Sequence, residues 1–213
     1  MGFPLMVLGK SGSGKTTAIR NMDPKSTVIC QIEKQRLPFR NAFPMTIQPA
    51  TYAHIMELFK QINAGQRKDI KSIVIDDSQF LIVNEFFDKA AEKGYDKFTS
   101  IALNFRNLIH YVNIGLPENV IVYFLHHTQV DEYGAVKAKT IGRMLDEKLT
   151  VEGCFDVVLM TERNQDGWWF RTHSAGNDPV KTPMEMFDDD LIPNDLAIVD
   201  AKIREYYGME AKK

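Results

Sequence analysis

Short apolar runs alternate with amphipathic stretches along most of this chain. The apolar runs, each of a length suited to a buried strand, occupy residues 4–8, 27–32, 72–77 and 119–125. The helical patterns between them occupy residues 16–22, 52–63, 79–93 and 100–113. Strands and helices in this alternation predict an α/β fold, with a mostly parallel sheet flanked by helices.

The last quarter of the sequence has a different pattern. Extended runs at 156–162 and 168–173 flank Asn164-Gln165-Asp166-Gly167, which is a hairpin signal. Residues 195–207 have a helical pattern, and Asn194 is the expected N-cap. We therefore expect a C-terminal hairpin and a terminal helix after the parallel part of the sheet.

Composition narrows the class of protein. The chain has 213 residues, of which 44% are hydrophobic, and we expect residues 1–213 to form a single domain around one sizeable core. No apolar run has the length of a membrane span, and the strand expected at residues 4–8 leaves no room for a signal peptide. We therefore expect a cytoplasmic protein without a membrane partner. A formal charge of −2 does not favour a general nucleic-acid binder, so any such contact must be local.

The strongest motif directly follows the first apolar run. Residues 9–16 read Gly-Lys-Ser-Gly-Ser-Gly-Lys-Thr, a full match to the phosphate-binding loop G-x-x-x-x-G-K-[ST]. Strand, glycine-rich turn and helix come in the order that aims backbone N–H groups at a phosphate chain. Lys15 is expected to reach the β- and γ-phosphates, and the Thr16 hydroxyl to ligate Mg²⁺. The residues expected to contact the nucleotide are Gly9, Lys10, Ser11, Gly12, Ser13, Gly14, Lys15, Thr16 and Thr17.

Two carboxylates end the third apolar run. An apolar strand that terminates in Asp is the Walker B pattern, and Asp76 is the first choice for holding Mg²⁺ opposite Thr16. Asp77 is the alternative metal-side residue, or polarises the attacking water, or caps the next helix together with Ser78. Successive residues of an extended chain point to opposite sides, so we expect the two carboxylates to have different roles.

Two further groups lie where strands are expected to end. Glu33 follows the second strand, where a carboxylate can orient water in line with a γ-phosphate, although it also fits a solvated loop. The fourth strand ends in His126 and His127, and we expect one of these histidines to face the ligand crevice and sense the γ-phosphate.

Together these features resemble the RecA-type P-loop ATPase core, and specifically the short phage-borne AAA-like ATPases that include RecA-like single-strand annealing recombinases. Residues 139–149 and 153–158 are similar to that family's Gly-Lys-Leu element and its Phe-Asp-Val-Val strand. The resemblance implies a RecA-like sheet, ATP with Mg²⁺ as ligands, Glu33 as the catalytic glutamate and His127 as the sensor. It also implies single-stranded DNA as a partner, in phage recombination, annealing or replication.

The resemblance places DNA at residues 129–140, which we expect to form a mobile loop after the sensor strand. The candidate DNA-binding cations are Lys137, Lys139, Arg143 and Lys148, and a lid-like or subunit-contacting loop is the alternative. Tyr133 and the aromatic run 168–170 are candidates for stacking on bases. RecA-like sites are often completed by a neighbouring subunit, so the same cations would act in trans in a homo-oligomer.

Three other functions share a phosphate-binding loop. A nucleotide kinase needs an Arg-rich lid, but the candidates Arg143 and Arg163 are scattered. A partition-type ATPase carries an extra signature lysine in its loop, a place that Lys10 occupies, although the surrounding loop lacks one glycine of that pattern. A non-enzymatic protein that binds ATP only for stability is the third alternative.

Overall fold

The computed structural model describes residues 1–141 and 150–209. The strands are β1 (Phe3–Gly9), β2 (Thr27–Gln31), β3 (Thr46–Ile47), β4 (Ser72–Asp76), β5 (Ile121–Val130), β6 (Val136–Ala138), β7 (Val157–Asn164), β8 (Gly167–Arg171) and β9 (Leu191–Pro193). The helices are η1 (Thr16–Asn21), α1 (Tyr52–Asn63), α2 (Gln79–Asp88), α3 (Asp96–Gly115), η2 (Val151–Cys154) and α5 (Leu196–Tyr207), with η1 and η2 of 3₁₀ type.

The strands form one mixed sheet of nine strands in the order β3-β2-β4-β5-β1-β7-β8-β9, and β6 pairs with β5 beyond this path. From β3 to β7 all neighbours are parallel, whereas β7-β8-β9 and β5-β6 are antiparallel. Strand β5 lies between β1 and β4, so the strand that enters the phosphate-binding loop is not adjacent to the strand that ends in Asp76. The expected mostly parallel α/β sheet of a P-loop NTPase is confirmed.

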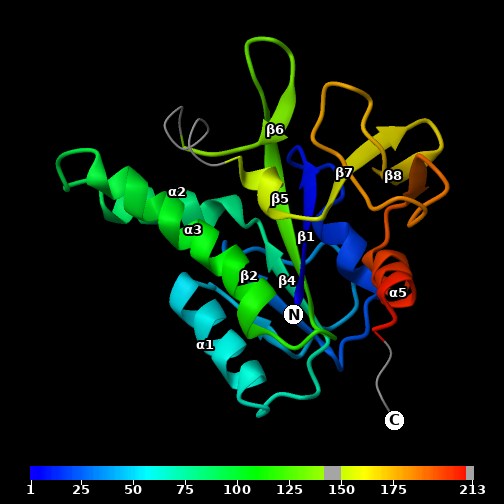
Figure 1. Ribbon diagram of the computed structural model, residues 1–213, viewed down its shortest axis with the longest axis horizontal. Coiled ribbons are helices and arrows are strands. Elements are labelled where there is room, and N and C mark those ends of the chain that lie inside the picture. Colours follow the sequence, from blue (N-terminus) through cyan, green and yellow to red (C-terminus); the bar gives the residue numbers. More distant parts are fainter. Residues whose placement is uncertain (142–149, 210–213) are drawn as a thin grey trace.

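Helices cover both faces of the sheet (Figure 1). Because side chains alternate along a strand, neighbouring residues of β1 enter different cores: Met6 packs with α1 and α3, whereas Val7 packs with η1 and α5. Strands buried on both faces read as continuous apolar runs, which is why the parallel strands could be recognised from hydrophobicity alone.

Several predicted elements are confirmed with shifted ends. The helix at 52–63 has the expected bounds, and the Thr51 side chain accepts a hydrogen bond from the His54 N–H. The helix expected at 79–93 ends at Asp88, and the next one begins at Asp96 instead of 100. The segment after the phosphate-binding loop is a short 3₁₀ helix that ends at Asn21.

Residues 129–140 do not form the mobile loop expected from their small side chains. Strand β5 continues to Val130 and pairs with β6, so His126 and His127 lie within the strand instead of at its end. The turn is closed by Asp131, whose carboxylate accepts hydrogen bonds from the Tyr133 and Ala135 N–H groups. The β-branched residues Val130 and Val136 pair beside this turn, an arrangement that favours a hairpin over a loop.

The C-terminal hairpin is confirmed, with Asn164 paired to Gly167 across the turn between β7 and β8. The prediction of Asn194 as the cap of the terminal helix is wrong. Asp195 is the N-cap residue of α5, and its carboxylate accepts a hydrogen bond from the Ala197 N–H at 2.9 Å. Among the described residues, no helix is both long and apolar enough to cross a membrane.

Candidate nucleotide-binding site

The loop that follows β1 requires glycine at its first position. A Cβ at Gly9 would lie 2.0 Å from Thr161 Oγ1 on β7 and 2.5 Å from Ser13 Oγ, so any other residue would have to displace these side chains. Gly12 and Gly14 have φ angles of +72° and +95°, which side chains with a Cβ rarely adopt. The Ser13 hydroxyl donates to the Lys10 carbonyl at 2.7 Å and accepts from Thr161, also at 2.7 Å. These hydrogen bonds tie the loop to β7.

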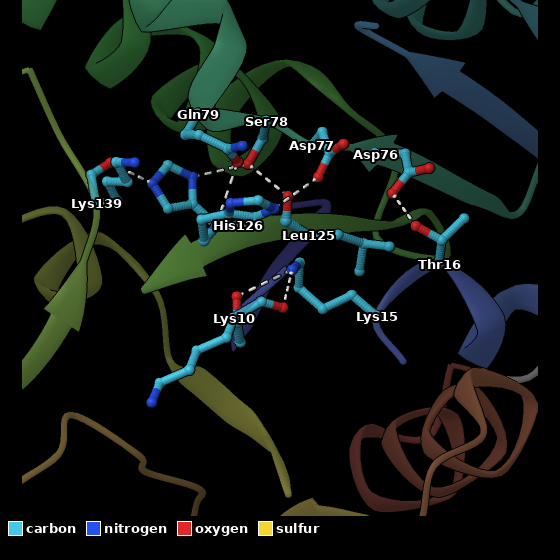
Figure 2. Close-up of polar contacts among 12 residues, drawn as sticks. Lys10, Lys15, Thr16, Asp76, Asp77, Ser78, Gln79, Leu125, His126 and Lys139 are labelled. Carbon is cyan, nitrogen blue, oxygen red and sulfur yellow. Dashed lines mark hydrogen bonds and ion pairs between the residues drawn. The ribbon is translucent and has the colours of Figure 1, made fainter. Parts of the chain in front are cut away.

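Lys15 has the chemistry expected for a phosphate partner. The side chain is buried, and its ammonium group donates to the carbonyls of Gly9 at 2.9 Å and Lys10 at 3.0 Å (Figure 2). Burial lowers the pKa of Lys15 to about 8, while the carboxylates of Asp77 and Asp76 act in the opposite direction. A phosphate chain beside this amine would favour its charged form.

Asp76 and Thr16 form the hydroxyl–carboxylate pair that a magnesium site needs. The Thr16 hydroxyl donates to Asp76 Oδ1 at 2.9 Å, which joins the end of β4 to the start of η1 (Figure 2). Burial and then the neighbouring Asp77 raise the pKa of Asp76 to about 6. Mg²⁺ typically binds one or two protein oxygens and completes its shell with water and substrate phosphates, so this pair fits the ion.

Asp77 takes a different direction from Asp76 because it has left the strand. Its φ angle of 59° is unusual for a residue with a side chain, and such strained backbone clusters at functional sites. Its carboxylate lies 3.2 Å from His127 Nε2. Burial opposes ionisation of Asp77, but the hydrogen bond and charge of His127, together with the charge of Lys15 and a hydrogen bond from Gln79, hold the pKa of this carboxyl below its usual range.

The two histidines of β5 have separate environments. His127 is paired in register with Gly9, and its backbone N–H donates to Gln79 Oε1 at 3.2 Å. His126 is completely buried, and burial lowers its pKa to about 4, which keeps it neutral. Since a carbonyl only accepts, His126 Nε2–H donates to the Lys139 carbonyl at 2.8 Å, and Nδ1 contacts the Ser78 hydroxyl at 2.9 Å (Figure 2).

These groups border a cavity of about 760 Å³. Residues from Ser11 to Thr17 form its floor, and Asp77 and His127 line it on one flank. The cavity therefore brings together Lys15, Thr16, Asp77 and His127 at the carboxyl ends of parallel strands, where open α/β sheets bind their ligands.

Other expected site residues lie elsewhere. Glu33 is not among the residues that line the cavity; its Oε1 accepts a hydrogen bond from Asn84 Nδ2 at 3.1 Å. Lys137 lies on the β5–β6 hairpin, 3.8 Å from Asp131, and Lys139 is exposed just beyond β6. Arg143 and Lys148 fall outside the described residues.

The cavity also has a second flank that the sequence motifs did not indicate. Arg20, Trp168 and Asn194 also line it. Trp168 lies on β8 and Asn194 directly follows β9, on the side of β1 away from β4 and β5. The sequence suggested Trp168 only as a candidate for stacking on DNA bases, and Asn194 only as a helix cap. No local motif connects these residues, because they come from η1, β8 and the segment before α5.

One of the comparisons with known proteins identifies a family for this chain. No curated protein matches the chain. A protein-family model described as an AAA domain matches residues 2–182, which include the phosphate-binding loop, the carboxylates of Asp76 and Asp77, and both histidines of β5. The chain therefore belongs to the AAA domain family and is an AAA-like P-loop ATPase.

Proposed function

We propose that this protein binds ATP with Mg²⁺ in the cavity above β1, hydrolyses it, and uses the cycle to act on single-stranded DNA. The observation that carries the ATPase part is the contact between the Thr16 hydroxyl and the Asp76 carboxylate, next to the buried Lys15. A hydroxyl, a carboxylate and an ammonium group at one end of a glycine-rich loop match the polar groups of a triphosphate and its metal ion.

Each of these residues has a distinct role in binding. The backbone N–H groups of residues 9–17 and the Lys15 ammonium would hold the phosphates, while Thr16 and Asp76 would hold Mg²⁺. When bound, Mg²⁺ neutralises charge on the β- and γ-phosphates. Because Asp76 is buried beside another carboxylate, a bound cation would stabilise its charged form.

Asp77 and Glu33 compete for the role of orienting the attacking water. Asp77 lines the cavity, and His127 holds its pKa low, so it is a carboxylate that can accept a hydrogen bond from water. Glu33 lies beyond β2 and is hydrogen-bonded to Asn84. We assign the role first to Asp77 with His127 as its partner, and keep Glu33 as the alternative.

The proposal of DNA as a partner rests on the β5–β6 hairpin. Tyr133 is 89% exposed at its tip, and an exposed aromatic ring next to cations is typical of surfaces that stack on single-stranded bases. The base of the hairpin is joined to the γ-phosphate flank, since the Lys139 N–H donates to the His127 carbonyl at 2.8 Å. A change at His127 on nucleotide binding would therefore reach the hairpin directly.

ATP turnover measured with and without single-stranded DNA tests both parts of this proposal. We expect Mg²⁺-dependent hydrolysis that DNA accelerates. Hydrolysis that DNA leaves unchanged, together with no DNA binding at low salt in any nucleotide state, would favour a DNA-independent ATPase. Phosphoryl transfer to a nucleoside or nucleotide acceptor would favour a kinase instead, and binding without turnover would favour a structural role for ATP.

A further inference from the structure

The cavity continues past the phosphate-binding loop on the side away from Asp77. In the sheet order, β4 and β5 lie on one side of β1, and β7, β8 and β9 lie on the other. The groups suited to the γ-phosphate and Mg²⁺, Asp76, Asp77 and His127, all come from β4 and β5 or directly follow them. The opposite flank, lined by Trp168 and Asn194, is therefore where the non-phosphate end of a nucleotide would lie.

Asn194 brings an unused hydrogen-bonding group to this flank. The residue is only 4% exposed, and its side-chain Nδ2 is buried without a hydrogen-bond partner among the described residues. Its backbone, by contrast, is fixed at both ends: the N–H donates to the Trp168 carbonyl at 3.2 Å, and the carbonyl accepts from Arg20 at 2.8 Å. A buried amide without a partner is costly, so such a group in a cavity points to a ligand.

Trp168 provides a flat apolar surface beside this amide. Trp168 is 49% exposed as a residue, and the Arg163 guanidinium lies 4.7 Å from the centroid of its indole ring. A Cβ at Gly14 would lie 3.0 Å from Trp168 Cδ1 and 3.5 Å from both polar side-chain atoms of Asn194. The indole edge and the amide thus both lie close to Gly14 of the phosphate-binding loop.

We propose that Trp168 and Asn194 form the subsite for the nucleotide base, and that this base is adenine. The proposal rests on the function proposed above, since it assigns the other end of the same ligand. The Trp168 ring would stack on the base, and the Asn194 amide would bond to its edge. An asparagine amide presents a donor beside an acceptor, which matches adenine N7 and N6–H₂, whereas the corresponding guanine edge, N7 and O6, has two acceptors.

The test compares ligands that share phosphates but differ in the base. Dissociation constants for ATP, GTP and inorganic tripolyphosphate, each with Mg²⁺, are measured by calorimetry for the parent and for Trp168→Ala, Trp168→Phe and Asn194→Ala. The control is Trp169→Ala, because Trp169 is the next residue but its indole N–H bonds to Asn164 and it does not line the cavity. Thermal unfolding of each variant identifies those that do not fold.

We expect the parent to bind ATP more tightly than GTP. Trp168→Ala should weaken ATP binding by about tenfold or more, the scale of one lost base–aromatic contact, and leave tripolyphosphate binding unchanged. Trp168→Phe should retain most of the affinity, Asn194→Ala should reduce the preference for ATP over GTP, and Trp169→Ala should match the parent.

Two results would overturn the assignment while the phosphate site stands. The first is a Trp168→Ala variant that folds and binds ATP as tightly as the parent does, and the second is a parent that binds ATP and GTP equally. If the parent binds tripolyphosphate no better than a Lys15→Ala variant does, the proposed nucleotide function fails as well. The two failures are thereby distinguished.

A second readout uses fluorescence. The chain has two tryptophans, so Trp169→Phe leaves Trp168 as the only one. Base stacking should quench its emission when ATP is added, and tripolyphosphate should not. Equal responses to both ligands would mean that no base contacts Trp168.

Discussion

The two flanks of β1 are built in different ways. On the β4–β5 flank, the functional groups are consecutive residues at the end of β4 and within β5. They are paired: Asp76 with Thr16, Asp77 with His127, and His126 with Ser78. On the β7–β9 flank, Trp168 lies on β8 and Asn194 directly follows β9, and Asn194 Nδ2 has no hydrogen-bond partner among the described residues.

This difference has a physical explanation. Charged groups that act on phosphates must be held rigidly, and buried charges are stable only when they are paired and hydrogen-bonded. A base needs only a flat surface and a few correctly placed polar atoms, which many local sequences can supply. Single substitutions on the β4–β5 flank are therefore expected to change the rate of ATP turnover. Single substitutions on the β7–β9 flank are expected to change which nucleotide binds.

The largest effect that would sharpen this comparison is on catalysis. Asp77→Asn should lower ATP turnover by about a hundredfold or more, the scale for a lost general base, because Asp77 lines the cavity and Glu33 does not. Glu33→Gln should change turnover by less than about tenfold on the same scale. Single-turnover hydrolysis, with ATP affinity measured in parallel, separates the two. A collapse of turnover in Glu33→Gln with normal hydrolysis in Asp77→Asn would reverse the assignment.

The next effect concerns the hairpin that leaves this flank. Replacing Lys137 and Lys139 together by Ala should weaken binding of single-stranded DNA and reduce the slope of log affinity against log salt by about one to two. ATP affinity should stay at the parental value. The matched control replaces Lys60 and Lys68, which are exposed at and beyond the end of α1. Figure 1 shows α1 well separated from β6. Unchanged DNA binding in the hairpin variant would rule out the β5–β6 hairpin as the DNA-binding surface.

The smallest expected effect is on stability and comes from His126. Its folded pKa of about 4 lies below the model-peptide value of 6.5, so the unfolded chain takes up the proton first as pH falls. The contribution of His126 to the free energy of unfolding is complete above pH 6.5 and falls between there and pH 4, by about 1 kcal/mol from pH 7.5 to 5.5.

Denaturant unfolding at these two pH values, for the parent and for His126→Asn, measures that contribution. Asp76 acts in the opposite direction because its pKa is raised, but it does so in both proteins and cancels in the difference. Equal pH dependence in the parent and in His126→Asn would show that His126 is not held neutral by burial.

The sequence predicted what depends on neighbouring residues. Parallel strands were recognised because strands buried on both faces are continuously apolar, and the phosphate-binding loop because Gly12, Gly14, Lys15 and Thr16 act through local backbone geometry. The pairing of Asp76 with Thr16 was expected from the Walker B pattern, and the two atoms lie 2.9 Å apart.

What depends on distant residues was missed. The polar stretch around Asp131 and Gly134 is compatible with a loop or with a hairpin. The pairing of β6 with β5 makes it a hairpin, and the local sequence does not specify this pairing. Asn194 and Asp195 are both residue types that favour a helix N-cap. The backbone of Asn194 is hydrogen-bonded to Trp168 and Arg20, and the Asp195 carboxylate accepts the cap hydrogen bond. The position of Trp168 above Gly14 depends on the order of β1, β7 and β8 in the sheet.

The central claim is that Lys15 and its loop hold the phosphates of ATP, and a calorimetric titration of ATP with Mg²⁺ tests it most directly. Lys10→Ala is the matched control, because Lys10 is an exposed lysine of the same loop. We predict that Lys15→Ala folds but binds ATP about a hundredfold or more weakly, the scale for losing a buried charged partner, and that Lys10→Ala binds as the parent does. Parental affinity in Lys15→Ala would contradict the account, and loss of binding in Lys10→Ala alone would favour the partition-type alternative.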